Sequence, residues 1–311
     1  MRRTPAAVCV GIAIGVLAIV AALAPSTGAY ENPPRVNLSY VIIGGESSYA
    51  VRRGDSLKLI GARFGVSPWV ISSINMIDPN ASLRIGQGLR IDNRHIVPAV
   101  IADGILVNIP QRMMFLFSEG DLLNSYPVAV GRPDLKWRTP AAMFKVLALD
   151  ENPVWLVPES IQEEMEEEGK EVETRIAAGP DNPLGGYRIK LSIPGYAIHS
   201  TIAPAGVYSF QSHGCVRLMP SDAEAFFGRM RIGIRGRTIY QPAMMALLPD
   251  GRIFAEINPD VYKMAGDPID TLHAIADSHK LGNMIDWNAA RIVADRHQGV
   301  AREITAGAAK P

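Results

Sequence analysis

Short apolar runs separated by glycine, proline and asparagine dominate the middle of the chain. From Gly104 onward they recur at 105–109, 113–117, 126–131, 143–147, 187–189, 196–198 and 238–240. Runs this short, punctuated by turn residues, predict the strands of an antiparallel all-β domain. One helix is expected within it, over 221–230. The pattern therefore predicts one mainly β domain over 104–242.

A smaller unit over residues 48–92 precedes this domain. Apolar residues at helical spacing follow Ser56 and again follow Pro68, and a strand pattern lies on either side of the pair. Asp55 or Ser56 can cap the first helix, and Gly65 can end it. The predicted order is β-α-α-β, and residues 93–103 are assigned to a linker.

Two other segments carry helical or charged patterns. Amphipathic patterns near 267–280 and 284–297 predict two helices in a C-terminal extension over 243–311. Between Trp155 and Tyr187, glutamate dominates an irregular segment. Such a run is usually a solvated helix face, and the alternative is a flap beside the active site.

The N-terminus has the pattern of an export sequence. Arg2 and Arg3 precede an apolar run over 8–24, and Thr27-Gly28-Ala29 offers a cleavage site. We expect residues 1–29 to be removed, with an uncleaved membrane anchor as the alternative. Either outcome places the chain in the periplasm or elsewhere in the cell envelope.

Charge and cysteine content narrow the function further. The 311 residues include 31 Lys+Arg and 31 Asp+Glu, so no net charge attracts nucleic acid to the chain. Of the two cysteines, Cys9 lies inside the predicted export sequence. Cys215 is then left alone in an oxidising compartment, which calls for a reactive thiol or an intermolecular bond.

Cys215 has neighbours suited to nucleophilic catalysis. A histidine, His199 or His213, can act as base and lower the pKa of the thiol, so that thiolate is present at neutral pH. Gly214 allows close backbone approach, and Arg217 would share a strand face with Cys215 and could hold a carboxylate. The alternatives are a zinc site formed by the two histidines and the cysteine, or a buried structural cluster.

Two parts of the chain resemble known families. Gly54-Asp55-Ser56-Leu57, Phe64-Gly65-Val66 and Leu89-Arg90-Ile91 resemble a LysM module. His199-Ser200, followed after a 16-residue step by Cys215 within Ser212-His213-Gly214-Cys215-Val216-Arg217, resembles the catalytic motif of the YkuD-type L,D-transpeptidases. The block Trp137-Arg138-Thr139-Pro140 is similar to theirs as well.

The resemblance implies a fold, an activity and a set of roles. The fold is an antiparallel β-sandwich or barrel-like domain with one or more helices, beside a small β-α-α-β LysM module. The activity is that of a cysteine acyltransferase of peptidoglycan, serving cell-wall biogenesis and cell shape without a metal or other cofactor. The roles it implies are Cys215 as nucleophile, His199 as general base, Ser200 orienting His199, His213 and Gly214 shaping the pocket and oxyanion site, and Arg217, Ser212 and Tyr196 contacting substrate.

The implied partners are peptidoglycan stem peptides and glycan strands, with an outer-membrane lipoprotein as an alternative acceptor and no nucleic acid. The LysM module would act as a tether, so that deleting residues 30–100 leaves turnover of a soluble stem peptide intact. Two other functions stay open. One is an L,D-carboxypeptidase with water as acceptor, and the other is a non-catalytic protein that binds the wall.

Overall fold

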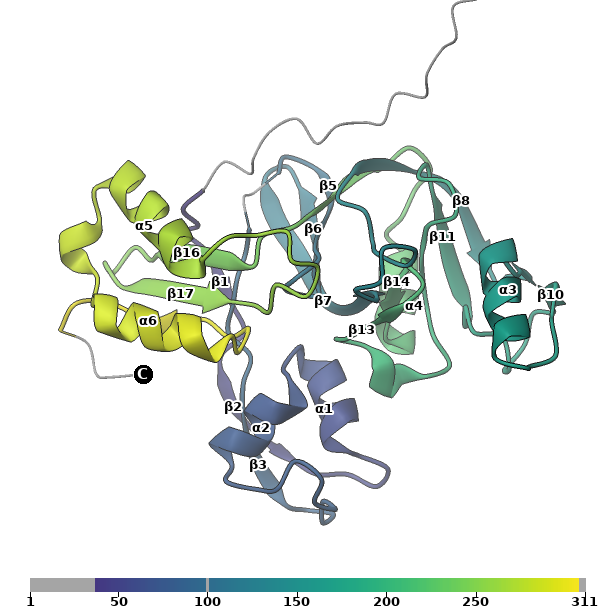
Figure 1. Ribbon diagram of the computed structural model, residues 1–311, viewed down its shortest axis with the longest axis horizontal. Coiled ribbons are helices and arrows are strands. Elements are labelled where there is room, and N and C mark those ends of the chain that lie inside the picture. Colours follow the sequence, from purple (N-terminus) through teal and green to yellow (C-terminus); the bar gives the residue numbers. More distant parts are fainter. Residues whose placement is uncertain (1–36, 99–100, 308–311) are drawn as a thin grey trace, which may run out of the picture. The chain divides into compact units, whose positions relative to one another are not determined.

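The computed structural model describes residues 37–98 and 101–307, so the predicted export sequence lies outside the described residues. Nine strands form the largest sheet (Figure 1). They are β5 (Gly104–Asn108), β6 (Met113–Ser118), β7 (Asp121–Gly131), β8 (Met143–Glu151), β11 (Tyr187–Leu191), β12 (Ala197–His199), β13 (Phe210–Ser212), β14 (Val216–Leu218) and β15 (Arg235–Ile239). Within the described ranges, no helix has the length and apolar character needed to cross a membrane.

The strand order makes this sheet barrel-like. Neighbours follow the order β13-β7-β14-β12-β11-β8-β15-β5-β6, and β6 also pairs with β7, which closes the ring. The predicted mainly β, barrel-like class is confirmed. Three pairs are parallel, namely β12 with β14, β13 with β7, and β15 with β5, whereas the sequence pattern predicts antiparallel strands. Alternating polarity does not reveal strand direction, because both kinds of ladder have the same side-chain period.

Alternate residues of these strands fill the interior of the ring. Val107, Val146, Ile189, Ile198 and Val216 belong to one buried cluster. Helix α4 (Pro220–Phe227) adds Phe226, which is fully buried against the same cluster. Since neighbouring residues of a strand point to opposite faces, the residues flanking these core positions face outward.

The unit before the barrel has the predicted β-α-α-β order. Strands β2 (Glu46–Ala50) and β3 (Gly88–Asp92) pair antiparallel around helices α1 (Leu57–Phe64) and α2 (Pro68–Ile74). The Ser56 hydroxyl accepts the Leu59 N–H at 3.1 Å and caps α1. Gly65 ends α1 with a φ of 70°, a conformation in which a side chain would be strained.

The C-terminal extension is a small sheet covered by helices. Strands β16 (Ala243–Leu247), β17 (Ile253–Ile257) and β18 (Arg302–Glu303) pair in that order. Helices α5 (Pro268–His279) and α6 (Trp287–Arg296), with the short 3-10 turn η2 (Gly282–Met284) between them, share a buried apolar cluster with this sheet. The two amphipathic patterns therefore mark real helices, whereas the strands were not predicted.

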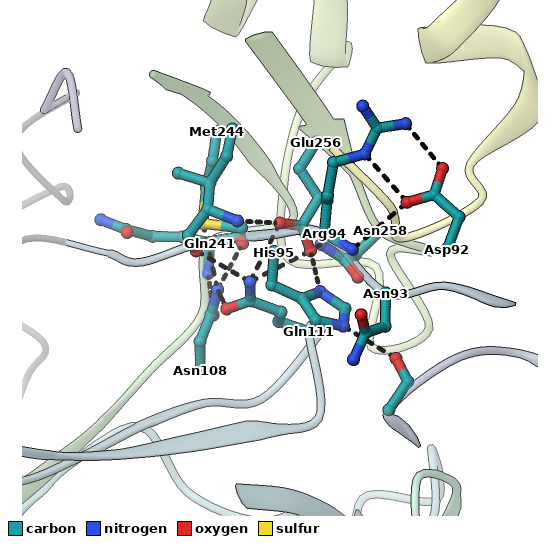
Figure 2. A network of polar contacts seen from close by, with 12 residues as sticks. Asp92, Asn93, Arg94, His95, Asn108, Gln111, Gln241, Met244, Glu256 and Asn258 are labelled. Carbon is teal, nitrogen blue, oxygen red and sulfur yellow. Dashed lines mark hydrogen bonds and ion pairs between the residues drawn. The ribbon is translucent and has the colours of Figure 1, made fainter. Parts of the chain in front are cut away.

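A buried polar network joins the three parts (Figure 2). Strand β4 (His95–Ile96), which pairs with β1 (Ile42–Ile43), lies in the segment assigned to a linker, yet His95 through Pro98 are buried. His95 contacts the Gly65 carbonyl at 2.8 Å and the Glu256 carboxylate at 3.1 Å. Glu256 also accepts the Gln111 side-chain amide at 3.0 Å. One carboxylate thus links the small unit, the barrel and the extension.

Helix α1 also packs on the barrel. Ala62 of α1 shares an apolar cluster with Val207 and Met219, with Leu59 beside it. Val207 follows the 3-10 turn η1 (Pro204–Gly206), which lies between the two halves of the catalytic motif. The small unit therefore packs on the barrel through apolar residues of α1 that are not part of its own core.

Candidate active site

Two adjacent strands bring the predicted cysteine and histidine to one face of the sheet. Strands β12 and β14 run parallel, with Ile198 opposite Val216 and His199 opposite Arg217. Ile198 and Val216 point into the core. His199 and Arg217, one residue further on, therefore face outward, and so does Cys215, one residue before Val216.

The backbone after His199 fixes the state of its ring. His199 is 5% exposed, and its Nδ1 lies 2.6 Å from the Ser200 carbonyl oxygen. A carbonyl only accepts, so Nδ1 carries the proton and Nε2 keeps its lone pair. Burial, and next the charge of Arg217, lower the pKa of His199 to about 3. Ser200 thus orients the ring through its carbonyl, and the imidazole is neutral at pH 7.

The Cys215 thiol is protonated at rest. Burial raises its pKa, and this effect outweighs the Ala197 N–H and the Arg217 charge, which lower it. Its Sγ lies 3.8 Å from the Gly195 carbonyl oxygen, an acceptor that favours the S–H form. The raised pKa favours the thiol at rest over the thiolate expected from the sequence, and that expectation stays a prediction. The sequence places a histidine near the thiol but does not reveal that both groups are desolvated.

Backbone geometry forces glycine at position 214. Its φ is 103°, and a Cβ there would lie 2.5 Å from the Tyr196 ring. The Tyr196 hydroxyl in turn donates to the Arg138 carbonyl at 3.2 Å. Tyr196, expected to contact substrate, therefore also sets the position of the backbone next to Cys215.

The side-chain hydroxyls of Thr139 and Tyr262, two residues far apart in the sequence, help to hold the backbone at Gly214. The Thr139 hydroxyl donates to the Gly214 carbonyl at 2.8 Å and accepts the Gly131 N–H at 2.9 Å. The Tyr262 hydroxyl accepts the Thr139 N–H at 3.1 Å and donates to the Gly131 carbonyl at 2.7 Å. Tyr262 lies in the extension, for which the sequence suggested no chemistry.

Ser212, the last residue of β13, lies in the interior beside the turn that carries Gly214 and Cys215. It is fully buried, and its hydroxyl donates to the Cys215 carbonyl at 2.5 Å and accepts the Gly214 N–H at 3.1 Å. Its expected contact with substrate is not compatible with this burial. The Gly214 N–H is occupied by this bond, so the backbone donor of Gly214 is not free for the oxyanion site expected there, and the next backbone donor is the Cys215 N–H.

The glutamate-rich segment forms a flap that is bonded to the catalytic motif. Strands β9 (Trp155–Leu156) and β10 (Arg175–Ile176) pair at its base, and helix α3 (Glu159–Glu167) lies between them (Figure 1). Glu164 of α3 contacts His213 Nε2 at 2.5 Å and Arg132 at 2.6 Å. Of the two interpretations left open by the sequence, this contact favours the flap.

His213 is placed to hold this flap. Its ring packs edge-on against Trp137 at 4.6 Å between centroids, and burial lowers its pKa. Arg132 and His213 together hold the pKa of Glu164 below its usual value, against the effect of burial. The ring contacts the flap through Glu164, and the role of His213 in shaping the pocket stays a prediction.

Arginines surround the cysteine and histidine. Arg217 is half-buried, and its Nε has no hydrogen-bond partner among the described residues. Arg188 lies opposite His199 on β11 and pairs with Asp150 at 2.8 Å. Both charges lower the pKa of His199 and of the Cys215 thiol. Arg217 is thus a half-buried cation on the sheet face that it shares with Cys215.

The zinc interpretation finds no support in the geometry. Across the part of the chain that the structure describes, no three His, Cys, Asp or Glu residues are grouped as metal ligands. A cysteine and a neutral histidine on one sheet face, with the Cys215 N–H as a backbone donor, have the composition of a cysteine-dependent acyl-transfer site. The fold and the site thus define a mainly β cysteine acyltransferase.

Comparison with known families gives the more specific assignment. The L,D-transpeptidase catalytic domain (YkuD) matches residues 102–240, and the LysM domain matches residues 49–92. The chain therefore contains a YkuD-type L,D-transpeptidase catalytic domain and a LysM domain, and the catalytic domain is that of an acyltransferase. Both resemblances seen in the sequence are confirmed.

Curated relatives carry the same family name. The probable L,D-transpeptidase YcfS of Escherichia coli is 26% identical over 84% of this chain and 84% of its own length. The probable L,D-transpeptidase ErfK/SrfK of Salmonella typhimurium is 26% identical over 75% of this chain and 79% of its own. Among solved structures, the match to the L,D-transpeptidase from Mycobacterium smegmatis has a sequence identity of 21% and a TM-score of 0.33. The match covers 43% of this chain and 57% of that protein's chain.

Proposed function

We propose that this protein is a peptidoglycan L,D-transpeptidase in which Cys215 is the nucleophile and His199 the general base. The observation that carries the proposal is the hydrogen bond between His199 Nδ1 and the Ser200 carbonyl. Because Nδ1 donates to this carbonyl, Nε2 is the basic nitrogen on the sheet face that His199 shares with Cys215. A thiol and a neutral base on one face can exchange a proton as the thiol attacks.

In the first half-reaction, Cys215 attacks the carbonyl at the L-centre of the third residue of a tetrapeptide stem. The Sγ–C bond forms while His199 Nε2 takes the thiol proton. The tetrahedral oxyanion faces the Cys215 N–H, and the C–N bond to the terminal D-Ala then breaks. His199 returns its proton to the leaving amine, which departs as D-Ala and leaves a thioester.

In the second half-reaction, an acceptor amine attacks the thioester. His199 takes a proton from that amine and returns it to Sγ as the C–S bond breaks, so the thiol is regenerated. A neighbouring stem yields a 3-3 crosslink, and a lipoprotein lysine yields a protein attached to the wall. No nucleotide is consumed, because the free energy of one amide is kept in the thioester.

Arg217 is proposed to bind a carboxylate of the donor stem. Its guanidinium is half-buried, faces the same side as Cys215 and has an unpartnered Nε. A charge-assisted bond from the guanidinium to a carboxylate would position the carbonyl for attack. Tyr196, Gly214 and His213 complete the pocket around it.

The setting proposed for this reaction is the cell envelope. The LysM module would bind glycan strands, and the N-terminal pattern over 1–29 would direct export. Both fit a substrate found outside the cytoplasm.

The test uses purified protein and disaccharide-tetrapeptide. We expect mass spectrometry to find a crosslinked dimer that has lost one D-Ala, and Cys215→Ala to form none. The Ser212→Ala variant, which loses a hydroxyl three residues before Cys215, should still form a measurable amount of the crosslinked dimer. Product that is only the tripeptide would indicate the carboxypeptidase instead, and product with Cys215→Ala would remove the nucleophile assignment.

A further inference from the structure

Basic side chains follow the outer face of the sheet away from the active site. On β8, β11 and β15 the residues next to core positions Phe144, Val146 and Ile189 face outward. Gly236 faces the Phe144 ring, so its neighbours on β15 face outward too. The outward positions are occupied by Lys145, Arg188, Lys190, Arg235 and Arg237. We call these five residues the basic track.

The track carries uncompensated charge. Lys145 and Arg235 lie directly opposite each other on antiparallel strands, and both are exposed. Like charges in this position destabilise a sheet. The ion pairs among the described residues include Asp150 with Arg188 on this face, but none to the other four members of the track. A repulsive arrangement with one carboxylate for five cations fits a surface that is completed by an anionic ligand.

Two further features fit a peptide ligand. Arg237 is half-buried, and its Nε has no hydrogen-bond partner among the described residues. Met143, opposite Arg237, is 75% exposed, and Leu147 of the same strand is 48% exposed. Apolar side chains between cations suit a chain that carries both methyl groups and carboxylates.

The track is continuous with the active site. Lys190 lies opposite Ala197, and Arg188 lies opposite His199, on neighbouring strands. Cys215 is one strand further, so its backbone is two strand spacings, or roughly 10 Å, from Lys190. Arg235 and Arg237, on β15, are about four spacings, or ~20 Å, from β14. A short extended peptide reaching Cys215 could span this distance.

We propose that the basic track binds the acceptor stem peptide, and this inference rests on the proposed transpeptidase function. Crosslinking brings two carboxylate-bearing peptides to one cysteine, and these peptides repel each other. Arg217 binds the carboxylates of the donor stem beside the nucleophile. The basic track binds the carboxylates of the acceptor stem, along the path by which that stem approaches the thioester.

The test separates the two stems by chemistry. The acceptor is offered either with free carboxylates or with the same carboxylates amidated, and crosslinking is followed by mass spectrometry. Wild type should show a KM about tenfold lower for the carboxylate acceptor, which is the effect expected of a few exposed charge pairs acting together. Lys145→Gln/Lys190→Gln/Arg235→Gln should lose most of this preference, and added salt should reduce it in wild type.

A matched control removes three exposed charges elsewhere. Lys280→Gln/Arg291→Gln/Arg296→Gln changes the C-terminal helices and should keep the wild-type preference. The rate of adduct formation between Cys215 and a carbapenem, measured without acceptor, reports whether each variant is folded. An unchanged preference in the track variant, or an equal loss in the control, would overturn the inference. Absence of any crosslink with wild type would instead overturn the proposed function, and this inference with it.

Discussion

At the residue scale, the site combines two groups that are both uncharged at rest. Burial raises the pKa of the Cys215 thiol and lowers that of His199 to about 3. The ion pair forms only as the thiol attacks, when its charge is passed on to the substrate carbonyl. A thiol that is protonated at rest is protected in this way, because oxidation and unwanted alkylation proceed through the thiolate.

The pH dependence of thiol alkylation tests this state. Because the pKa of Cys215 is raised, thiolate becomes abundant only at alkaline pH. We expect the rate with iodoacetamide to be low at pH 7 and to rise about tenfold per pH unit toward pH 9. His199 does not gain a proton until the pH approaches 3, so no step in the rate is expected near pH 6.5. A plateau of fast alkylation from pH 6 to 8 would show a resting thiolate.

Substitution of Tyr262 tests whether its hydrogen bonds hold the backbone at Gly214 in position next to Cys215. Tyr262→Phe removes a buried hydroxyl that bonds Thr139 and the Gly131 carbonyl, at a cost of about 1–2 kcal/mol in the free energy of unfolding. Because Thr139 holds Gly214, kcat should fall about five- to tenfold while KM stays unchanged. The control is Tyr208→Phe, whose hydroxyl has no partner among the described residues. Equal kcat values for the two variants would contradict a positioning role.

At the scale of elements, sequence predicted the strands of the barrel and the helices of the small unit well. Alternation and turn residues determine them locally. It did not predict the parallel pairing of β12 with β14, which sets the face shared by His199, Cys215 and Arg217. It also missed Tyr262, which reaches the site from a distant segment without a motif of its own. Glu164 was included only in a glutamate-rich segment, for which a flap was one of two interpretations. In the sequence, Thr139 stood out only as part of the block Trp137-Arg138-Thr139-Pro140, which is similar to that of the YkuD-type L,D-transpeptidases.

The flap offers an element-scale prediction with a built-in control. Glu164→Ala removes the contacts to His213 and Arg132, whereas Glu163→Ala removes only an exposed pair with Lys136. Both keep good helix formers in α3. We expect hydrogen exchange of the α3 amides to become about tenfold faster in the first variant, since charge-assisted bonds are lost. It should be nearly unchanged in the second, since exposed pairs contribute little. Equal exchange rates would show that Glu164 does not hold the flap.

At the scale of the whole described molecule, the small unit is more than a tether. Helix α1 packs its apolar side on residues around η1, and His95 from the segment assigned to a linker is buried against Glu256. Deleting residues 30–100 would expose these surfaces. The structure therefore changes the expectation drawn from sequence: we expect the deletion to lower the stability of the barrel and its turnover, as well as binding to the wall.

Glu256 tests whether the three parts unfold together. It is fully buried and is bonded to His95, Gln111 and the Ile96 N–H. Glu256→Ala leaves these groups unpaired, which should cost about 3–5 kcal/mol in the free energy of unfolding. The control Glu46→Ala removes exposed pairs with Arg90 and Arg94 and should cost under ~1 kcal/mol. Urea unfolding should show one transition, and two separate transitions would contradict a common unit.

The central claim is that Cys215 carries the acyl group. The most direct measurement is intact-protein and peptide mass spectrometry of the enzyme quenched in acid during turnover of a tetrapeptide stem. We predict a mass increase equal to the stem without its terminal D-Ala, located on the peptide that contains Cys215 and absent from Cys215→Ala. Turnover without any such adduct, or an adduct on another residue, would contradict the account.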